Sequence, residues 1–448
     1  MKNISTIVLF LIGTLVSAQS PTSEMLHEIA SAPSAERIEK SIQKLVGFGT
    51  RHTLSDTLSD TRGIGAARRW IKSEFDQISE NCSNCLEVFY HSAIEPKNDR
   101  RIIRDTKIVN VVAIQRGSLY PNRYVIMSGD IDSRVSDPNN YTSDSPGAND
   151  NASGMAGTIE AARVLSKYSF PVSIVYVGLS GEEQGLFGGK HLAQKAKKEG
   201  WDVIGIINND MIGNIHGIDG VIDNGSFRVF SEAMSMSLTD DEKRAMRFYG
   251  GEVDGPSRQL ARYIDRVTDE YMTNLDAIMI YRLDRFGRGG HHRPFNDEGF
   301  TGVRIMETHE NYNRQHQDLR EENGIKYGDV IEWVDFDYAA KLTAVNALTL
   351  ASLASAPEAP KNLSIGGAVQ ASTQLLWDSS DDSTLLGYRI YWRKTTSPQW
   401  EHSKFVGKTN NYELENLVID NYLFGVSSVG KNGAESLIAF PYKLIPRN

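Results

Sequence analysis

From residue 35 to residue 353 the sequence alternates stretches of helical periodicity with short apolar, β-branched runs. The runs predict strands at 108–114, 124–127, 172–177, 203–207, 227–230, 277–281 and 303–306. Helices are expected at 35–46, 64–78, 188–198 and 337–353. This alternation predicts an α/β fold in which helices flank a central mixed, largely parallel sheet.

Acidic residues recur where three of these strands end. Asp130 and Asp132 follow one strand, Glu182 and Glu183 the next, and Asp210 a third. Open α/β sheets carry their sites beyond the carboxyl ends of their strands. Because neighbours on an extended chain point to opposite sides, one glutamate can hold a metal while the other faces the reacting water. By themselves the two glutamates are equally compatible with a solvated acidic turn.

Length, charge and the N-terminal residues limit the class of protein. A chain of 448 residues suits two domains, and a net charge of -9 argues against a nucleic-acid partner. Residues 1–19 combine Lys2, an apolar run and small residues, which predicts a signal peptide and a secreted or periplasmic protein. The run is too short to span a membrane, and we expect no span elsewhere. Cys82 and Cys85, the only cysteines, predict a local disulfide in such a chain.

Four segments, taken in order, resemble the motif blocks of the zinc aminopeptidase family. They read Gly-Ala-Asn-Asp-Asn-Ala-Ser-Gly at 147–154, Gly-Glu-Glu-Gln-Gly-Leu at 181–186, Asn-Asp-Met-Ile-Gly at 209–213 and Gln-His-Gln-Asp at 315–318. That family includes secreted bacterial leucyl aminopeptidases, aminopeptidase Y and the glutamate carboxypeptidases. The resemblance covers about residues 35–355 and implies a metallopeptidase domain with two zinc ions.

The resemblance also implies roles for individual residues. Asp150 would bridge the two ions, Glu183 and His316 would complete one zinc site, and Asp210 would bind the other ion. Glu182 would be the general base that takes a proton from a metal-activated water. Asp132 matches an acid that lies beside a ligand.

The sequence departs from this family at the first ligand position, where Asp130 replaces a histidine. Asp130, Asp150 and Asp210 would then form an all-oxygen second site. Three carboxylates make such a site more anionic and give it only hard oxygen ligands, so its preference for zinc over manganese or magnesium is weaker. Weak occupancy of this second site is an alternative.

A second departure lies in a segment that lines the substrate cleft in the family. Here Gly290 and His291 stand where serine and aspartate are usual. We expect His292 at the cleft wall and His291 to be exposed. The tyrosine that donates to the oxyanion in leucyl aminopeptidases has no counterpart, so Arg285 or Arg288 is expected to substitute.

After a Pro-rich linker at 354–360 the pattern changes to short strands at 375–377, 388–392, 412–414 and 422–429, typical of a small β-sandwich. Trp377, Tyr388 and the segment 421–426 resemble a fibronectin type III module. The predicted organisation is a signal peptide at 1–19, the metallopeptidase domain at 20–355 and a fibronectin type III-like domain at 356–448. Contact of this last domain with an extracellular polymer is one role left open.

The expected function is that of an exported, metal-dependent aminopeptidase acting on peptides. A carboxypeptidase or glutaminyl cyclase activity on the same fold is an alternative. A third reading is an inactive adhesion or binding protein, which the missing histidine and the C-terminal module suggest. Retention of Glu182, Glu183, Asp150, Asp210 and His316 argues against that third reading.

Overall fold

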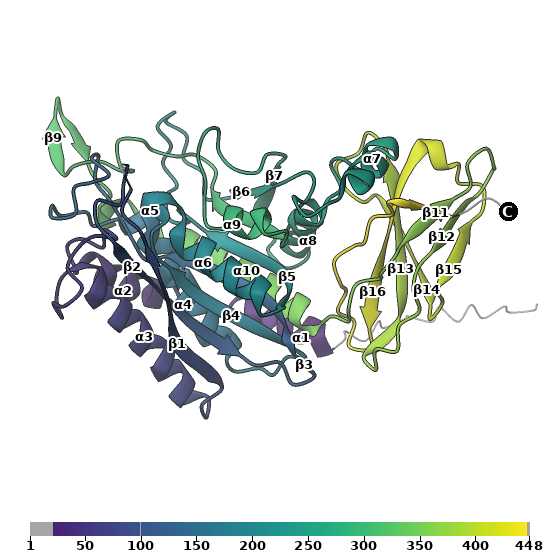
Figure 1. The fold of residues 1–448 in the computed structure, drawn as a ribbon, viewed down its shortest axis with the longest axis horizontal. Coiled ribbons are helices and arrows are strands. Elements are labelled where there is room, and N and C mark those ends of the chain that lie inside the picture. Colours follow the sequence, from purple (N-terminus) through teal and green to yellow (C-terminus); the bar gives the residue numbers. More distant parts are fainter. Residues whose placement is uncertain (1–20, 99, 446–448) are drawn as a thin grey trace, which may run out of the picture.

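The computed structural model describes residues 21–98 and 100–445, so the predicted signal peptide lies outside the described residues. An eight-stranded sheet in the order β1-β2-β4-β3-β5-β8-β6-β7 forms the centre of the larger part (Figure 1). Its inner strands β4, β3, β5 and β8 run parallel, whereas β1, β2 and β6 pair antiparallel with their inner neighbours. The predicted mixed α/β fold is therefore confirmed. The strands are β1 (Leu86–Glu95), β2 (Thr106–Gln115), β3 (Tyr120–Asp130), β4 (Val172–Leu179), β5 (Asp202–Asn209), β6 (Ser226–Ser231), β7 (Asp276–Ile280) and β8 (Gly302–Glu307).

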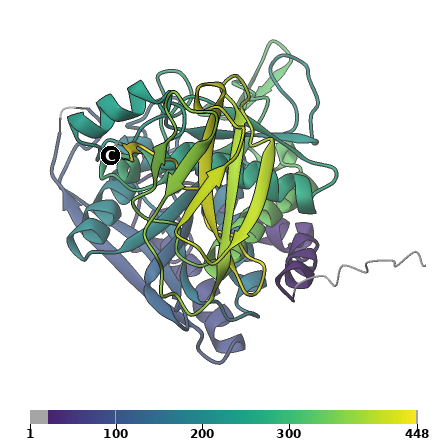
Figure 2. The same ribbon diagram turned by 90° about the vertical axis from the view of Figure 1, so that its right-hand side faces the viewer.

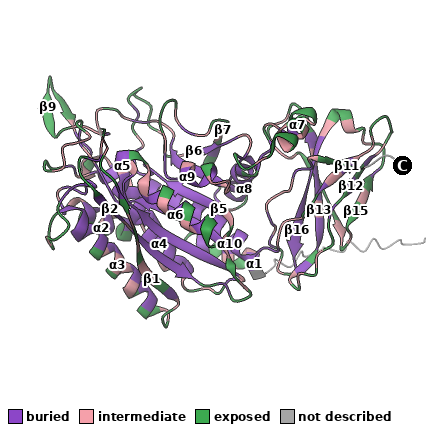
Figure 3. Cartoon of the chain, viewed as in Figure 1, coloured by how far each residue is buried: buried purple, intermediate pink, exposed green. Residues whose placement is uncertain are grey.

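Helices cover both faces of this sheet, because its strands are apolar on both sides. In β2, Val111 and Ala113 pack into the core under α2, α3, α4, α8 and α10, while Val112 and Ile114 face α6 and α9. Figure 3 shows this interior as continuous buried residues. The helices are α1 (Pro21–Ala30), α2 (Ala35–Val46), α3 (Gly63–Asn81), α4 (Gly154–Leu165), α6 (Phe187–Lys198), α7 (Asp240–Phe248), α8 (Pro256–Tyr271), α9 (His292–Asp297) and α10 (Phe336–Ser355). None of the described helices is long and apolar enough to cross a membrane.

The C-terminal part consists of two small sheets that lie at one end of the molecule (Figures 1 and 2). One has the strand order β15-β12-β11-β17 and the other β14-β13-β16. Their facing side chains form a separate core, in which the rings of Trp377 and Tyr388 meet edge to face at 5.2 Å. The strands are β11 (Ser364–Gly366), β12 (Thr373–Leu376), β13 (Leu385–Lys394), β14 (His402–Gly407), β15 (Asn411–Leu414), β16 (Tyr422–Gly430) and β17 (Lys443–Leu444). A hairpin of β9 (Arg320–Glu322) and β10 (Ile325–Tyr327) projects from the larger part.

A buried charge cluster joins the two parts. Asp254, just before α8, pairs with Arg262 of α8 at 2.7 Å and with Arg393 of β13 at 2.7 Å. All three side chains are at most 3% exposed. Because a buried charge is tolerated only when it is paired, this cluster fixes the C-terminal part against α8.

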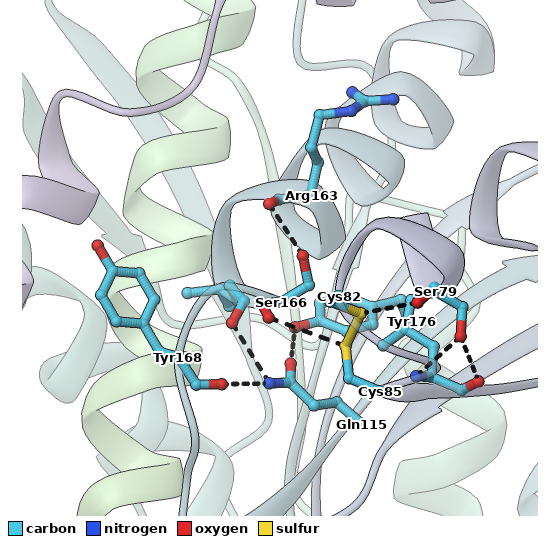
Figure 4. Close-up of a disulfide and its surroundings, with 10 residues drawn as sticks. Ser79, Cys82, Cys85, Gln115, Arg163, Ser166, Tyr168 and Tyr176 are labelled. Atoms are coloured by element: carbon cyan, nitrogen blue, oxygen red, sulfur yellow. Dashed lines mark hydrogen bonds between the residues drawn. A yellow bond between two sulfur atoms is a disulfide. The ribbon is translucent and has the colours of Figure 1, made fainter. Parts of the chain in front are cut away.

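The predicted disulfide between Cys82 and Cys85 is present just after α3 (Figure 4). Ser79 anchors the same turn, because its hydroxyl donates to the Leu86 carbonyl at 2.8 Å and accepts from the Leu86 amide at 3.2 Å. The turn leads directly into edge strand β1.

Candidate metal centre

The parallel strands bring the predicted acids to one edge of the sheet. Asp130 is the last residue of β3 and lies opposite Leu179 at the end of β4, while Asp210 follows β5. Glu182 and Glu183 were expected to lie on extended chain. Instead they begin a short helix, α5 (Glu182–Gly185). Their different surroundings therefore come from the first turn of a helix and not from strand alternation.

Three of the predicted ligands converge. Nε2 of His316 lies 2.9 Å from Oδ2 of Asp150 and 3.0 Å from Oε1 of Glu183. Two carboxylates and one imidazole are donors that zinc commonly takes, and tetrahedral ligands 2.0–2.1 Å from an ion lie about 3.3 Å apart. The donor types and their spacing thus fit one zinc ion.

Side chains around these three residues hold them in place. Nε of Arg134 donates to Glu183 Oε2 at 2.7 Å, and its Nη2 donates to His316 Nδ1 at 2.7 Å. Nε2 of His316 faces the two carboxylates. Asp329 accepts the backbone N–H groups of Asn149 and Asp150 at 2.9 and 2.7 Å, which fixes the loop that carries Asp150.

Asp132 lies beside the two glutamates. Its carboxylate accepts the backbone N–H groups of Glu182 and Glu183 at 3.2 and 3.1 Å and the hydroxyl of Thr53 at 2.9 Å. A carboxylate at a helix N-terminus satisfies amides that have no partner within the helix. Asp132 therefore orients the start of α5.

The predicted second set is Asp130, Asp150 and Asp210, and two of these acids have protein partners in this structure. Within 21–98 and 100–445, the buried group with three donor atoms inside 4.8 Å of one another is Asp150, Glu183 and His316. Asp130 accepts instead from His291 Nδ1 at 2.6 Å and from Asn151 Nδ2 at 2.8 Å. Asp210 forms an ion pair with Arg304 of β8 at 2.8 Å. Oδ1 of Asp210 and Nε2 of His291 are both buried and have no hydrogen-bond partner among the described residues. A second ion held by Asp130, Asp150 and Asp210 stays a prediction.

Both histidine predictions at the start of α9 were wrong. His291 is fully buried against Asp130 and is not exposed. His292 is also fully buried, lies 2.8 Å from the Leu283 carbonyl through Nε2, and does not line the cleft. The reason is the same for both: this segment packs beneath the carboxyl edge of the sheet, where burial lowers the pKa of each imidazole to about 4.

A cleft of about 650 Å³ opens over the three ligand candidates. Glu182 and Asp210 line it, and so do Arg285 and Arg288, where they were expected. Burial of the Glu182 carboxyl raises its pKa well above the ordinary value, and the charge of Glu183 raises it further.

Comparisons with known proteins agree with this geometry. The model of peptidase family M28 matches residues 110–336, which span the candidate ligands. The chain belongs to peptidase family M28. This M28 peptidase is 39% identical over 423 residues to a probable zinc metalloprotease of Pyrenophora tritici-repentis, covering 94% of this chain and 98% of the relative. It is 42% identical over 422 residues to one of Leptosphaeria maculans, with 94% and 97% covered. It is therefore a zinc metallopeptidase.

The fold is also that of a solved relative. The Legionella pneumophila LapA aminopeptidase superposes with a TM-score of 0.53 at 18% identity, over 75% of this chain and 76% of that one. LapB from the same organism gives a TM-score of 0.51 at 16% identity, with 75% and 76% covered. These likenesses confirm an aminopeptidase-like α/β architecture.

Proposed function

We propose that this M28 peptidase is an exported aminopeptidase in which Asp150, Glu183 and His316 hold zinc and Glu182 acts as general base. The observation that carries the proposal is the convergence of three ligand atoms beside Glu182 at one cleft. Zinc bound there would polarise the scissile carbonyl and bring the pKa of a bound water down to roughly 7.

The chain's own residues supply the proton transfers. The Glu182 carboxylate takes a proton from the attacking water and later gives it to the leaving amine. Asp132 accepts the backbone N–H groups of both Glu182 and Glu183, so the base Glu182 and the ligand Glu183 keep a fixed separation. Arg285 or Arg288, both on the cleft, can donate to the carbonyl oxygen as it becomes negative.

Cleavage at the N-terminus is supported by the acids of the cleft. Glu182, Asp210 and Asp297 all line it, and Asp297 is exposed without an ion pair among the described residues. A carboxylate in such a position can accept the α-ammonium group of a peptide. Export is supported by the pattern of residues 1–19 and by the disulfide, which persists in oxidising compartments.

For the C-terminal part we propose a fibronectin type III-like domain at 356–448, following a metallopeptidase domain at 20–355. A contact with an extracellular polymer through its outer face would suit an exported enzyme. Binding of the isolated polymer to the full chain is the test of that role.

A second candidate function is a carboxypeptidase. Arg288 and Arg293 line the cleft, and neither forms an ion pair within the part of the chain that the structure describes. Free guanidinium groups bind carboxylates well, which would suit a peptide C-terminus.

Hydrolysis of aminoacyl chromogenic substrates and of N-terminally blocked peptides separates these functions. An aminopeptidase cleaves the first and not the second, and Glu182→Gln should abolish that cleavage while zinc stays bound. Cleavage of blocked peptides alone would establish the carboxypeptidase. No cleavage of either would favour a binding protein.

A further inference from the structure

We propose that this peptidase prefers peptides whose N-terminal residue is glutamate or aspartate, and that Arg293, with Arg288 beside it, binds the side-chain carboxylate. The inference rests on the proposed aminopeptidase function and names its substrate class. It assigns a role to Arg293, to which the sequence motifs give none.

One wall of the cleft is basic. The residues between β7 and α9, together with α9 itself, place Arg285, Arg288 and Arg293 on it. Arg285 is already neutralised, because its Nη1 lies 2.8 Å from Oε2 of Glu310. Arg288 is exposed, and neither its side chain nor that of Arg293 forms an ion pair within 21–98 and 100–445. Two guanidinium groups on this wall therefore keep their full positive charge.

The Arg293 guanidinium also has unused hydrogen-bond donors. Its Nη1 donates to the Arg288 carbonyl over a long 3.4 Å, and its Nε is buried without a partner among the described residues. A buried donor without an acceptor is unfavourable, and a carboxylate can accept two parallel N–H bonds from one guanidinium. Gly289 leaves room for the side chain, since a Cβ there would lie 2.9 Å from Nη1 of Arg293. A substrate carboxylate would supply the acceptor that the protein does not.

The acids nearest to this wall do not neutralise it. Glu298 lines the cleft but pairs with Lys197 at 3.0 Å. Asp297 lies one turn beyond Arg293 on α9, and the two form no ion pair in the part of the chain that the structure describes. Arg101 adds a further cation to the cleft, and its Nη1 donates to the Glu183 carbonyl at 2.5 Å. The wall is therefore attractive to an anionic side chain.

An acidic N-terminal residue carries both charges that the cleft complements. In the proposed aminopeptidase the α-ammonium group meets the acids of the cleft, Glu182 and Asp210 among them. The side-chain carboxylate of the same residue would then meet Arg293. An apolar side chain such as leucine would leave the guanidinium without an acceptor, and a site built for a polar group discriminates strongly against a substrate that lacks it.

The test compares kcat/KM for glutamyl p-nitroanilide with that for glutaminyl p-nitroanilide, which has nearly the same shape and no charge. We expect the zinc-loaded full-length enzyme to favour the glutamyl substrate by about 10–100-fold. Equal values for the two substrates would overturn the inference and leave the aminopeptidase intact. Cleavage of N-acetylated peptides alone would place a C-terminal carboxylate at these arginines and overturn both proposals, as would no cleavage at all.

The variant Arg293→Gln tests the residue. We expect it to lower the glutamyl-to-glutaminyl ratio about tenfold, chiefly by raising KM for the glutamyl substrate. Arg282→Gln is the matched control, because Arg282 is exposed and does not line the cleft, and its ratio should equal that of the wild type. Equal losses on both substrates in Arg293→Gln would indicate a purely structural role and contradict the inference.

Salt dependence provides a measurement that needs no variant. Ions screen a carboxylate–guanidinium pair at an open cleft, so the wild-type ratio should fall in about 1 M sodium chloride. If Arg293→Gln does not fold, this measurement decides the question, and a ratio that salt does not lower would overturn the inference.

Discussion

Replacing Asp254 by asparagine tests how firmly the C-terminal part is joined to the peptidase. Asp254 is fully buried and receives Nη1 of Arg262 at 2.7 Å and Nη2 of Arg393 at 2.7 Å. Asparagine keeps the size and one acceptor but leaves two guanidinium groups, 3% and 2% exposed, without a counter-charge. Removing one partner from a buried pair costs about 3–5 kcal/mol. With two arginines affected, we expect the upper part of that range.

The assay is urea unfolding followed by circular dichroism, with the free energy taken from the first transition. Glu36→Gln is the matched control, because its pair with Lys40 is 2.7 Å long but 74% and 69% exposed. We expect the control to unfold at nearly the same urea concentration as the wild type, because water screens an exposed pair. A loss below about 1 kcal/mol for Asp254→Asn would show that the cluster does not hold the two parts together.

Further predictions concern the site and its surroundings. Glu182→Gln should lower kcat by about 10²–10⁴-fold with zinc content unchanged, measured by turnover and metal analysis. Asp132→Asn should weaken zinc binding about 10–100-fold in a competition titration, since it releases the start of α5; an unchanged affinity would exclude that role. Burial raises the pKa of Asp284, but the charge of Arg304 and that of His292 lower it to about 2. The ionised Asp284 carboxylate therefore adds about 2 kcal/mol to the free energy of unfolding above pH 3.8. This contribution is lost as the pH falls through about 2. Acid unfolding of Asp284→Asn should lack this dependence. Chelation of zinc should lower Tm, and added zinc should restore it.

The fold and the candidate ligands could be predicted because their signals are local. Each parallel strand is a short apolar run, and its acid follows within a few residues. The residues at the carboxyl edge of the sheet can therefore be predicted from the sequence. Strand β1 was not predicted, because only its two end residues, Leu86 and Glu95, are buried and apolar residues do not alternate regularly between them. The start of α5 was also missed. It depends on Gly181 and Leu186, both in left-handed conformation at its two ends.

The residues that contact the candidate ligands could not be predicted, since these contacts depend on how strands far apart in the sequence pair with one another. His291 and Asp130 are separated by 161 residues, and Arg134 and His316 by 182. Arg304 gave one usable signal: a charged residue inside an otherwise apolar strand predicts a buried counter-ion. Which acid supplies it follows only from the pairing of β8 with β5.

The most direct test of the zinc site is anomalous diffraction at the zinc absorption edge from crystals of the zinc-saturated protein. We predict one strong peak about 2.0–2.2 Å from the nearest oxygens of Asp150 and Glu183 and from Nε2 of His316. The absence of a peak at His316 would contradict the assignment of these three residues as the zinc ligands.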